Sequence, residues 1–302
     1  MSLFAKSIFT DEPAEGWLPW GALAPILALL LFTLPLISIN ALLLQPLGFV
    51  DQNFDPVGPI GMALFLFISF GFAGSLFLAW VKYIERRPFS SIGFIPQNAF
   101  QTFMRGYAVG TGLMLLIIVS TWGLGGYEAG ATFPAFNSPI ALLQITLLLI
   151  GFALQSSVEE FVFRGWLLSV LTRKFNIITA VIVSSVLFTF MHFNPANPWV
   201  DNISIFLFSI FACAWVLKTG NIWGVMGWHA GWNWITATGF EVPVTGLTTD
   251  TPALLVQLTP VGSNFLTGGD QGPEGSIMCI VVLAVATLFW ILKPRSKELA
   301  VN

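Results

Sequence analysis

Apolar residues are gathered in long runs along this chain, and short polar stretches separate each run from the next. A helix needs about 20 mostly apolar residues to cross the hydrocarbon core of a bilayer, and roughly 17 to 25 are tolerated. Several runs contain glycine or proline, which membrane helices accept more readily than soluble helices do. The pattern predicts eight transmembrane helices, near residues 21–44, 57–81, 106–123, 138–158, 177–192, 202–217, 221–238 and 276–292.

The composition also indicates a membrane protein. Of the 302 residues, 56% are apolar and only 9% are charged, whereas a soluble domain carries roughly 25% charged residues. The chain is also too apolar to remain disordered. With a net charge of -3 and scattered basic residues, it has no expected nucleic-acid partner. We therefore expect an all-α polytopic membrane helix bundle that forms a single membrane domain over residues 1–302.

The distribution of charge predicts the orientation of this bundle. Lys and Arg residues near the ends of a span are retained in the cytoplasm. With eight spans and the N-terminus inside, all 12 basic residues fall in inner segments, so both termini are expected in the cytoplasm. The long outer connection, 239–275, is expected to be an irregular loop or a lid. The inner stretch 82–105 is expected to hold a short interfacial helix.

A small set of polar residues interrupts the apolar runs. An ionisable side chain inside a bilayer costs about 2.5 to 3.5 kcal/mol, so such residues are functional candidates. Both histidines of the chain belong to this set, which indicates one shared site rather than separate packing roles. The candidates are Glu159 and Glu160 at the end of the fourth run, His192 at the end of the fifth, and His229 and Asn233 in the seventh.

The seventh run combines two patterns with a period of four. His229 and Asn233 are four residues apart, so they share one face of a helix and can meet one ligand. Gly227 and Gly231 form a small-xxx-small pattern, which lets another helix approach closely. We expect this approach to bring the His229 face near the acidic residues and the histidine of other helices.

The two adjacent acids are expected to have different roles. Neighbouring residues are about 100° apart around a helix, so Glu159 and Glu160 cannot face one cavity in the same way. Glu160 and Arg164 have a favoured spacing for an ion pair, which leaves Glu159 free to point at the histidines. His192 lies about 22 Å from the inner end of its helix, so Glu159 meets it only if the fourth helix continues past Arg164. We expect this continuation because residues 161–171 are mostly apolar.

These groups together suit hydrolysis. Glu159, helped by one histidine, can take a proton from water, while the other histidine and Asn233 can donate hydrogen bonds to an oxyanion. Glu159, His192 and His229 can instead hold a divalent metal such as zinc, with an open position for water. The residues alone leave the glutamate-dependent and the metal-dependent mechanism open.

Two other functions fit a membrane protein with such residues. Buried Glu and His residues also form proton relays, so a proton-coupled transporter is one alternative. A non-catalytic membrane partner or immunity protein is the other. The halves of the chain show no inverted repeat of the kind that many transporters contain. Hydrolysis therefore remains the leading interpretation.

At these residues the chain resembles the CPBP (CAAX prenyl protease and bacteriocin-processing, also called Abi) family of intramembrane endopeptidases. The family pattern is Glu-Glu-xxx-Arg, then Phe-xxx-His, then His-xxx-Asn on successive helices. Here the three motifs occupy Glu159–Arg164, Phe188–His192 and His229–Asn233, in that order. The resemblance covers about residues 138–238, which it identifies as the catalytic core.

The resemblance implies a cleft open to the cytoplasm, in which a membrane-associated peptide or protein is cleaved. Members of the family are often labelled metalloproteases, although a metal-independent glutamate mechanism has also been argued. The chain is compact, as prokaryotic members of the family are. We therefore expect an integral, multi-pass protein of a prokaryotic plasma membrane. The implied roles are water activation by Glu159 and His192, oxyanion stabilisation by His229 and Asn233, and shaping of the cleft by Glu160 and Arg164.

Overall fold

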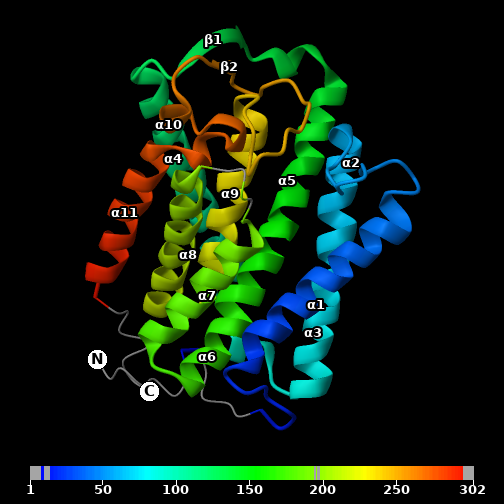
Figure 1. The fold of residues 1–302 in the computed structure, drawn as a ribbon, viewed down its shortest axis with the longest axis vertical. Coiled ribbons are helices and arrows are strands. Elements are labelled where there is room, and N and C mark those ends of the chain that lie inside the picture. Colours follow the sequence, from blue (N-terminus) through cyan, green and yellow to red (C-terminus); the bar gives the residue numbers. More distant parts are fainter. Residues whose placement is uncertain (1–7, 10–13, 194, 196–197, 295–302) are drawn as a thin grey trace.

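The computed structural model describes residues 8–9, 14–193, 195 and 198–294, and Figure 1 shows an elongated bundle of helices. Its helices and strands are α1 (Leu23–Ile39), α2 (Gly58–Leu64), α3 (Phe70–Ala79), α4 (Ala99–Gly123), β1 (Tyr127–Thr132), α5 (Pro139–Glu160), α6 (Leu168–Lys174), α7 (Ile177–Met191), α8 (Trp199–Thr219), α9 (Trp223–Gly239), β2 (Val256–Pro260), α10 (Asn264–Thr267) and α11 (Ile277–Leu292). The described part of the chain also contains four π-helical segments, of which Phe65–Ser69 joins α2 to α3 and Phe161–Leu167 joins α5 to α6.

Each predicted apolar run forms a helical segment in the described part of the chain, so the all-α polytopic bundle is confirmed. Five segments are long and apolar enough to cross a membrane: Leu23–Leu44, Gly58–Glu85, Ala99–Gly123, Pro139–Lys174 and Trp199–Thr219. Two further apolar helices, α7 and α11, are shorter. The helix α9, which corresponds to the seventh run, has 17 residues.

The predicted end of the fourth span at residue 158 is wrong, and the expected continuation past Arg164 is confirmed. The helix runs without a break from Pro139 to Lys174, through α5, a π-helical stretch and α6. Glu159 and Glu160 therefore lie well inside the bundle. Arg164, which the orientation argument counted among inner-side charges, is also completely buried here.

Local sequence signals explain where several helices begin and end. The side chains of Ser138, Asn176 and Ser276 accept hydrogen bonds from backbone N–H groups in the first turns of α5, α7 and α11, which is the usual role of an N-cap residue. Pro139 occupies the first position of α5, where a missing N–H has no cost. Gly220 ends α8 in the left-handed conformation, with φ of 62°, as a C-cap glycine does.

The outer connection 239–275 is not wholly irregular, contrary to the expectation. It contributes β2, which pairs antiparallel with β1 in a two-stranded sheet across one end of the bundle, and the short helix α10 (Figure 1). The inner stretch 82–105, expected to hold a short interfacial helix, contains the end of a π-helical segment (Trp80–Glu85), a 3-10 turn at Phe89–Ile92 and the beginning of α4.

Basic residues lie at the end of the bundle opposite the sheet. Lys82, Lys174, Lys218 and Lys293 are at or just after the ends of helical segments that finish there (Figure 1). The amino group of Lys218 donates to the carbonyl oxygens of Ile291 and Lys293, at 2.9 and 2.7 Å, and so ties α8 to the end of α11. The chain ends, whose cytoplasmic position was predicted, lie outside the described residues.

The helices α4 and α9 are in close contact through glycines. A Cβ atom on Gly110 of α4 would overlap the carbonyl oxygen of Trp228, and one on Gly227 of α9 would overlap that of Phe103. The prediction that Gly227 and Gly231 allow a close helix approach is thus confirmed. The approaching helix is α4, however, whereas the acidic pair lies on α5.

We expect Gly110→Ala to destabilise the bundle by about 1 to 3 kcal/mol, because its methyl group forces two packed helices apart. Gly112 on the same helix provides a matched control, since a Cβ atom there meets nothing within 4 Å. Gly112→Ala should be neutral or slightly stabilising, because alanine has the better helix propensity. The measurement is the unfolding of both purified variants in detergent, and equal stabilities would contradict the packing argument.

Candidate active site

The helices α5 and α9 position most of the candidate residues, and α7 adds one more. Glu159, Glu160, His229 and Asn233 are all at most 5% exposed. Glu159 and Glu160 end α5, while His229 and Asn233 lie one turn apart on α9. His192 follows the last residue of α7 and is half-buried. The structure therefore brings the acids and the His-Asn pair together from separate helices, as predicted.

Glu160 joins a buried group of three residues. Its Oε1 atom accepts a hydrogen bond from Arg164 Nη1 at 3.0 Å, which confirms the predicted ion pair. The same oxygen lies 2.9 Å from His229 Nδ1. Because a carboxylate accepts, His229 donates from Nδ1 and presents Nε2 to the remaining groups. This contact of Glu160 with His229 was not predicted.

Glu159 has one bonded and one unbonded oxygen. Oε1 accepts a hydrogen bond of 2.7 Å from Gln155 Nε2. Oε2 is buried, has no hydrogen-bond partner among the described residues, and lies 4.0 Å from His229 Nε2. A buried carboxylate oxygen without a partner is unfavourable in a structural role. It is well suited to accept a proton or a hydrogen bond from a bound molecule.

Gln155 was overlooked at the sequence level. Its Oε1 atom accepts hydrogen bonds from Asn233 Nδ2 at 3.0 Å and from Ser156 Oγ at 3.1 Å. It therefore links α5 to α9 between Glu159 and Asn233. The sequence does contain a hint of this role, because Gln155 lies in an apolar run one turn before Glu159. An uncharged polar residue in such a run indicates function less strongly than a charged residue does.

His192 is held by its own helix. Its Nδ1 atom lies 2.9 Å from the carbonyl oxygen of Phe188, and since a carbonyl only accepts, Nδ1 is the donor and Nε2 is left available. The two rings of Phe188 and His192 are also 4.5 Å apart between centroids. The fixed ring orientation is typical of a histidine that must present one nitrogen to a ligand.

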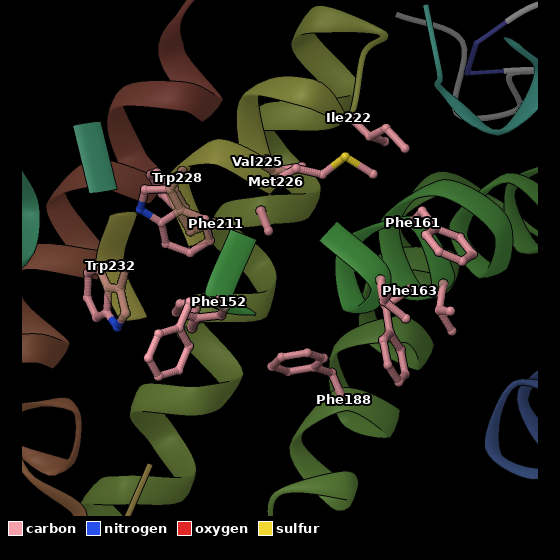
Figure 2. Packing of buried hydrophobic residues seen from close by; sticks show 14 of the residues in the cluster. Phe152, Phe161, Phe163, Phe188, Phe211, Ile222, Val225, Met226, Trp228 and Trp232 are labelled. Atoms are coloured by element: carbon pink, nitrogen blue, oxygen red, sulfur yellow. The ribbon is translucent and has the colours of Figure 1, made fainter. Parts of the chain in front are cut away.

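Aromatic side chains surround these polar groups. Figure 2 shows Phe163 and Phe188 on one side and Phe211, Trp228 and Trp232 on another. Phe163 and Phe188 meet edge to face at 5.2 Å between centroids, and Phe211 and Trp228 are 4.5 Å apart. The guanidinium carbon of Arg164 lies 4.0 Å from the centre of the Phe188 ring. These rings keep the site apolar, which strengthens every electrostatic interaction inside it.

Two cavities meet at His192. The larger, of about 180 Å³, has Gln155, Glu159, His192 and Asn233 on its polar side and apolar residues of α2, α3 and the π-helical stretch between them on another. The smaller, of about 40 Å³, adjoins His192 and His229. Glu159, His192 and Asn233 thus face one space from three helices, large enough for part of a substrate together with water.

The outer connection also reaches into the site. Thr245 lines both cavities. Glu274 accepts hydrogen bonds from Trp232 Nε1 at 2.6 Å and from Thr245 Oγ1 at 2.9 Å, so it ties the connection to α9. Burial raises the pKa of Glu274 above that of an ordinary carboxyl group, and the donors on Trp232 and Thr245 oppose this rise. These contacts could not be predicted from the sequence, because no sequence pattern indicates which residue of α9 meets which residue of the outer connection.

The candidate metal ligands do not form a three-ligand centre. The part of the chain that the structure describes contains no group of three or more His, Cys, Asp or Glu side chains arranged to hold a metal ion. His229 uses Nδ1 for Glu160 and has only Nε2 facing Glu159. The predicted set of Glu159, His192 and His229 therefore does not fit a zinc site in this arrangement, and no step below depends on a metal.

Residues 141–235 match the family model described as Rce1-like, type II CAAX prenyl endopeptidase. No curated protein matches the chain. The matched region runs from the first turn of α5 into α9, so it contains each of the six candidate residues and both helices that position the acids and the His-Asn pair. This agrees with the three motifs read from the sequence, so the resemblance to the CPBP family of intramembrane proteases is confirmed over residues 141–235.

Proposed function

We propose that this protein is an intramembrane endopeptidase that hydrolyses a peptide bond of a membrane-associated peptide or protein. The observation that carries the proposal is the single cavity that Glu159, His192 and Asn233 line from three helices. The family match supports protease activity in general. We assign the catalytic core to residues 138–238, and the remaining helices to the same single domain.

In the proposed reaction, water is activated by Glu159 and His192. Glu159 Oε2 has no other partner, so it accepts a proton from a water molecule that His192 helps to orient. The water oxygen then attacks the carbonyl carbon of the scissile bond and forms a tetrahedral intermediate. Glu159 next passes the proton to the amide nitrogen, the C–N bond breaks, and a carboxylic acid and an amine leave. General acid–base catalysis of this kind contributes about 10²- to 10⁴-fold in rate.

His229 and Asn233 stabilise the negative charge that develops on the carbonyl oxygen. Asn233 Nδ2 carries two N–H groups. One donates to Gln155 at 3.0 Å, and the other makes a longer contact of 3.5 Å with Ser156 Oγ, which it can exchange for the oxyanion. His229 donates from Nε2 when both of its ring nitrogens carry protons. Glu160 and Arg164 have supporting roles, since Glu160 holds the His229 ring at Nδ1 and Arg164 compensates the charge of Glu160.

The apolar wall of the larger cavity indicates the kind of substrate. Met62, Phe65, Leu66 and Phe70 lie across from the polar groups. This wall would contact the apolar side chains next to the scissile bond and shield them from lipid and water. We therefore propose an apolar segment of a membrane-associated chain as the substrate, in a prokaryotic plasma membrane, with the bilayer itself as the surrounding partner.

The test of this function compares membrane peptides from cells that carry the wild type and the Glu159→Ala variant. A precursor that accumulates only with the variant would establish proteolysis and identify the substrate. If no peptide differs while proton uptake into membrane vesicles does, the protein is a proton-coupled carrier. If neither differs, the protein is a non-catalytic partner.

We expect Asn233→Ala to lower turnover about 10²- to 10³-fold, because it removes one donor to the oxyanion. Asn233→Asp should not restore activity, since a carboxylate repels the oxyanion. Turnover of the accumulating precursor by purified protein in lipid vesicles gives both values. An active Asp variant would contradict the role as donor and would indicate a ligand to a cation.

Treatment with a chelator provides the control for this prediction. Because Glu159, His192 and His229 do not form a three-ligand centre, we expect full activity in a sample whose metal content is negligible. The metal content and the turnover should be measured on the same preparation. Activity that returns only after zinc is added would overturn the glutamate-activated water.

A further inference from the structure

Gln155 is a buried side chain that hydrogen-bonds to both a proposed catalytic carboxylate and a proposed oxyanion donor. It lies one turn before Glu159 on α5 and is 7% exposed. Its Nε2 atom donates to Glu159 Oε1 at 2.7 Å, and its Oε1 atom accepts from Asn233 Nδ2 at 3.0 Å. Both ends of the amide are therefore bound within the protein.

The chemistry of the partners fixes the orientation of this amide. If the side chain were rotated by half a turn, its oxygen would face the carboxylate of Glu159 and its nitrogen would face the amide nitrogen of Asn233. Two acceptors and two donors would then oppose each other. Ser156 Oγ also points at Gln155 Oε1, as a hydroxyl donor does. Only one orientation satisfies all three neighbours.

This orientation selects which atoms of the site remain available. Gln155 occupies Glu159 Oε1, so Oε2 is the oxygen that has no partner and lies nearer to His229. Gln155 also holds one N–H group of Asn233 at 3.0 Å, whereas the second N–H makes a longer contact of 3.5 Å with Ser156 Oγ, which it can exchange for a bound molecule. The base and the oxyanion donor are on different helices, and this amide is a direct hydrogen-bonded link between them.

We infer that Gln155 is a positioning residue, which holds the base Glu159 and the oxyanion donor Asn233 in a fixed relative arrangement across α5 and α9. The inference rests on the proposed function, because it assigns these two residues their roles. A displacement of a reacting group by about 1 Å can cost 10²-fold in rate. Loss of the link should accordingly reduce kcat by about 10- to 100-fold and leave KM unchanged, since both ends of the amide are used inside the protein.

The test uses Gln155→Met, which keeps the length of the side chain and removes its donor and acceptor. Gln144→Met is the matched control, because Gln144 lies on the same helix eleven residues earlier and outside the site. The substrate is a synthetic peptide that contains the cleavage site of the precursor accumulating with Glu159→Ala. The readouts are kcat, KM and the thermal unfolding midpoint, all in lipid vesicles.

A second arm separates positioning from a merely structural role. If Gln155 acts partly through Asn233, the double variant Gln155→Met/Asn233→Ala should lose less activity than the product of the two single losses. Should Gln155→Met fail to fold, Gln155→Asn serves instead. It keeps a polar amide in the same place but is one methylene shorter, so it cannot bridge Glu159 and Asn233 at hydrogen-bond distance and should show the same fall in kcat.

The outcomes distinguish this inference from the function on which it rests. A fall in kcat for Gln155→Met but not for Gln144→Met, together with a double variant less impaired than the product, supports it. Unchanged kcat per folded molecule, or losses that multiply, overturns it while Glu159→Ala remains inactive. If Glu159→Ala accumulates no precursor, the proposed function fails and the inference fails with it.

Discussion

Purified Glu159→Gln protein is expected to lose about 10²- to 10⁴-fold in turnover and to retain the unfolding midpoint of the wild type. The two side chains have nearly the same shape, and the amide oxygen still accepts the hydrogen bond that Gln155 gives to Oε1. What disappears is the basicity of Oε2. Turnover of the precursor and thermal unfolding, measured on one preparation, check both parts of this prediction.

Glu128→Gln is the control for the loss of an acidic charge, because Glu128 is exposed on β1 at the far end of the bundle. It should behave as the wild type does. The roles of the two adjacent acids would be exchanged if Glu159→Gln kept most of the activity while Glu160→Gln lost it without any change in stability.

Glu160→Gln is expected to have the largest effect on stability, a loss of about 3 to 5 kcal/mol in the free energy of unfolding. Arg164 is completely buried, and among the described residues Glu160 is the acidic side chain that forms an ion pair with it. Without the carboxylate, a guanidinium charge is left uncompensated in an apolar environment, and His229 Nδ1 has a neutral amide oxygen, a weaker acceptor, in place of the carboxylate. Unfolding by denaturant in detergent measures the difference.

The double variant Glu160→Gln/Arg164→Met tests the cause of this loss. Removing both charges of a buried pair is far less costly than removing one, so the double variant should recover much of the stability that the single variant loses. A double variant as unstable as Glu160→Gln would show that the bond to His229, rather than the charge of Arg164, accounts for the loss.

Features set by short spacing were predictable from the sequence. The ion pair of Glu160 with Arg164 and the shared face of His229 and Asn233 each depend on one turn of helix, which fixes the distance between the side chains. The continuation of the fourth helix was also predictable, since residues 161–171 are apolar. The predicted end of this span at residue 158 was wrong. Two adjacent acidic residues usually indicate that a helix has left the membrane, but here both have hydrogen-bonding or ion-pair partners inside the bundle.

Contacts between distant segments were not predictable in the same way. The bond from Gln155 to Asn233 joins residues 78 positions apart, and that from Trp232 to Glu274 crosses from α9 into the outer connection. The pairing of β1 with β2 likewise depends on how α4 and α9 are placed. No periodicity in one chain encodes which loop meets which helix, so these contacts appear only in the folded structure.

In the larger cavity, the polar groups and much of the apolar wall come from different helices. The reactive groups come from α5, α7 and α9, and α9 is fixed against α4 by glycines that tolerate no added atom. Part of the apolar wall comes from Met62 to Phe70, on helices that carry none of the six candidate residues, and the rest comes from Phe152, Val244 and Leu247. Substitutions in that wall can change its size and shape while the hydrolytic groups stay in place. Under the proposed function, related proteins could therefore differ in substrate preference through Met62–Phe70 while the groups proposed to carry out hydrolysis stay the same.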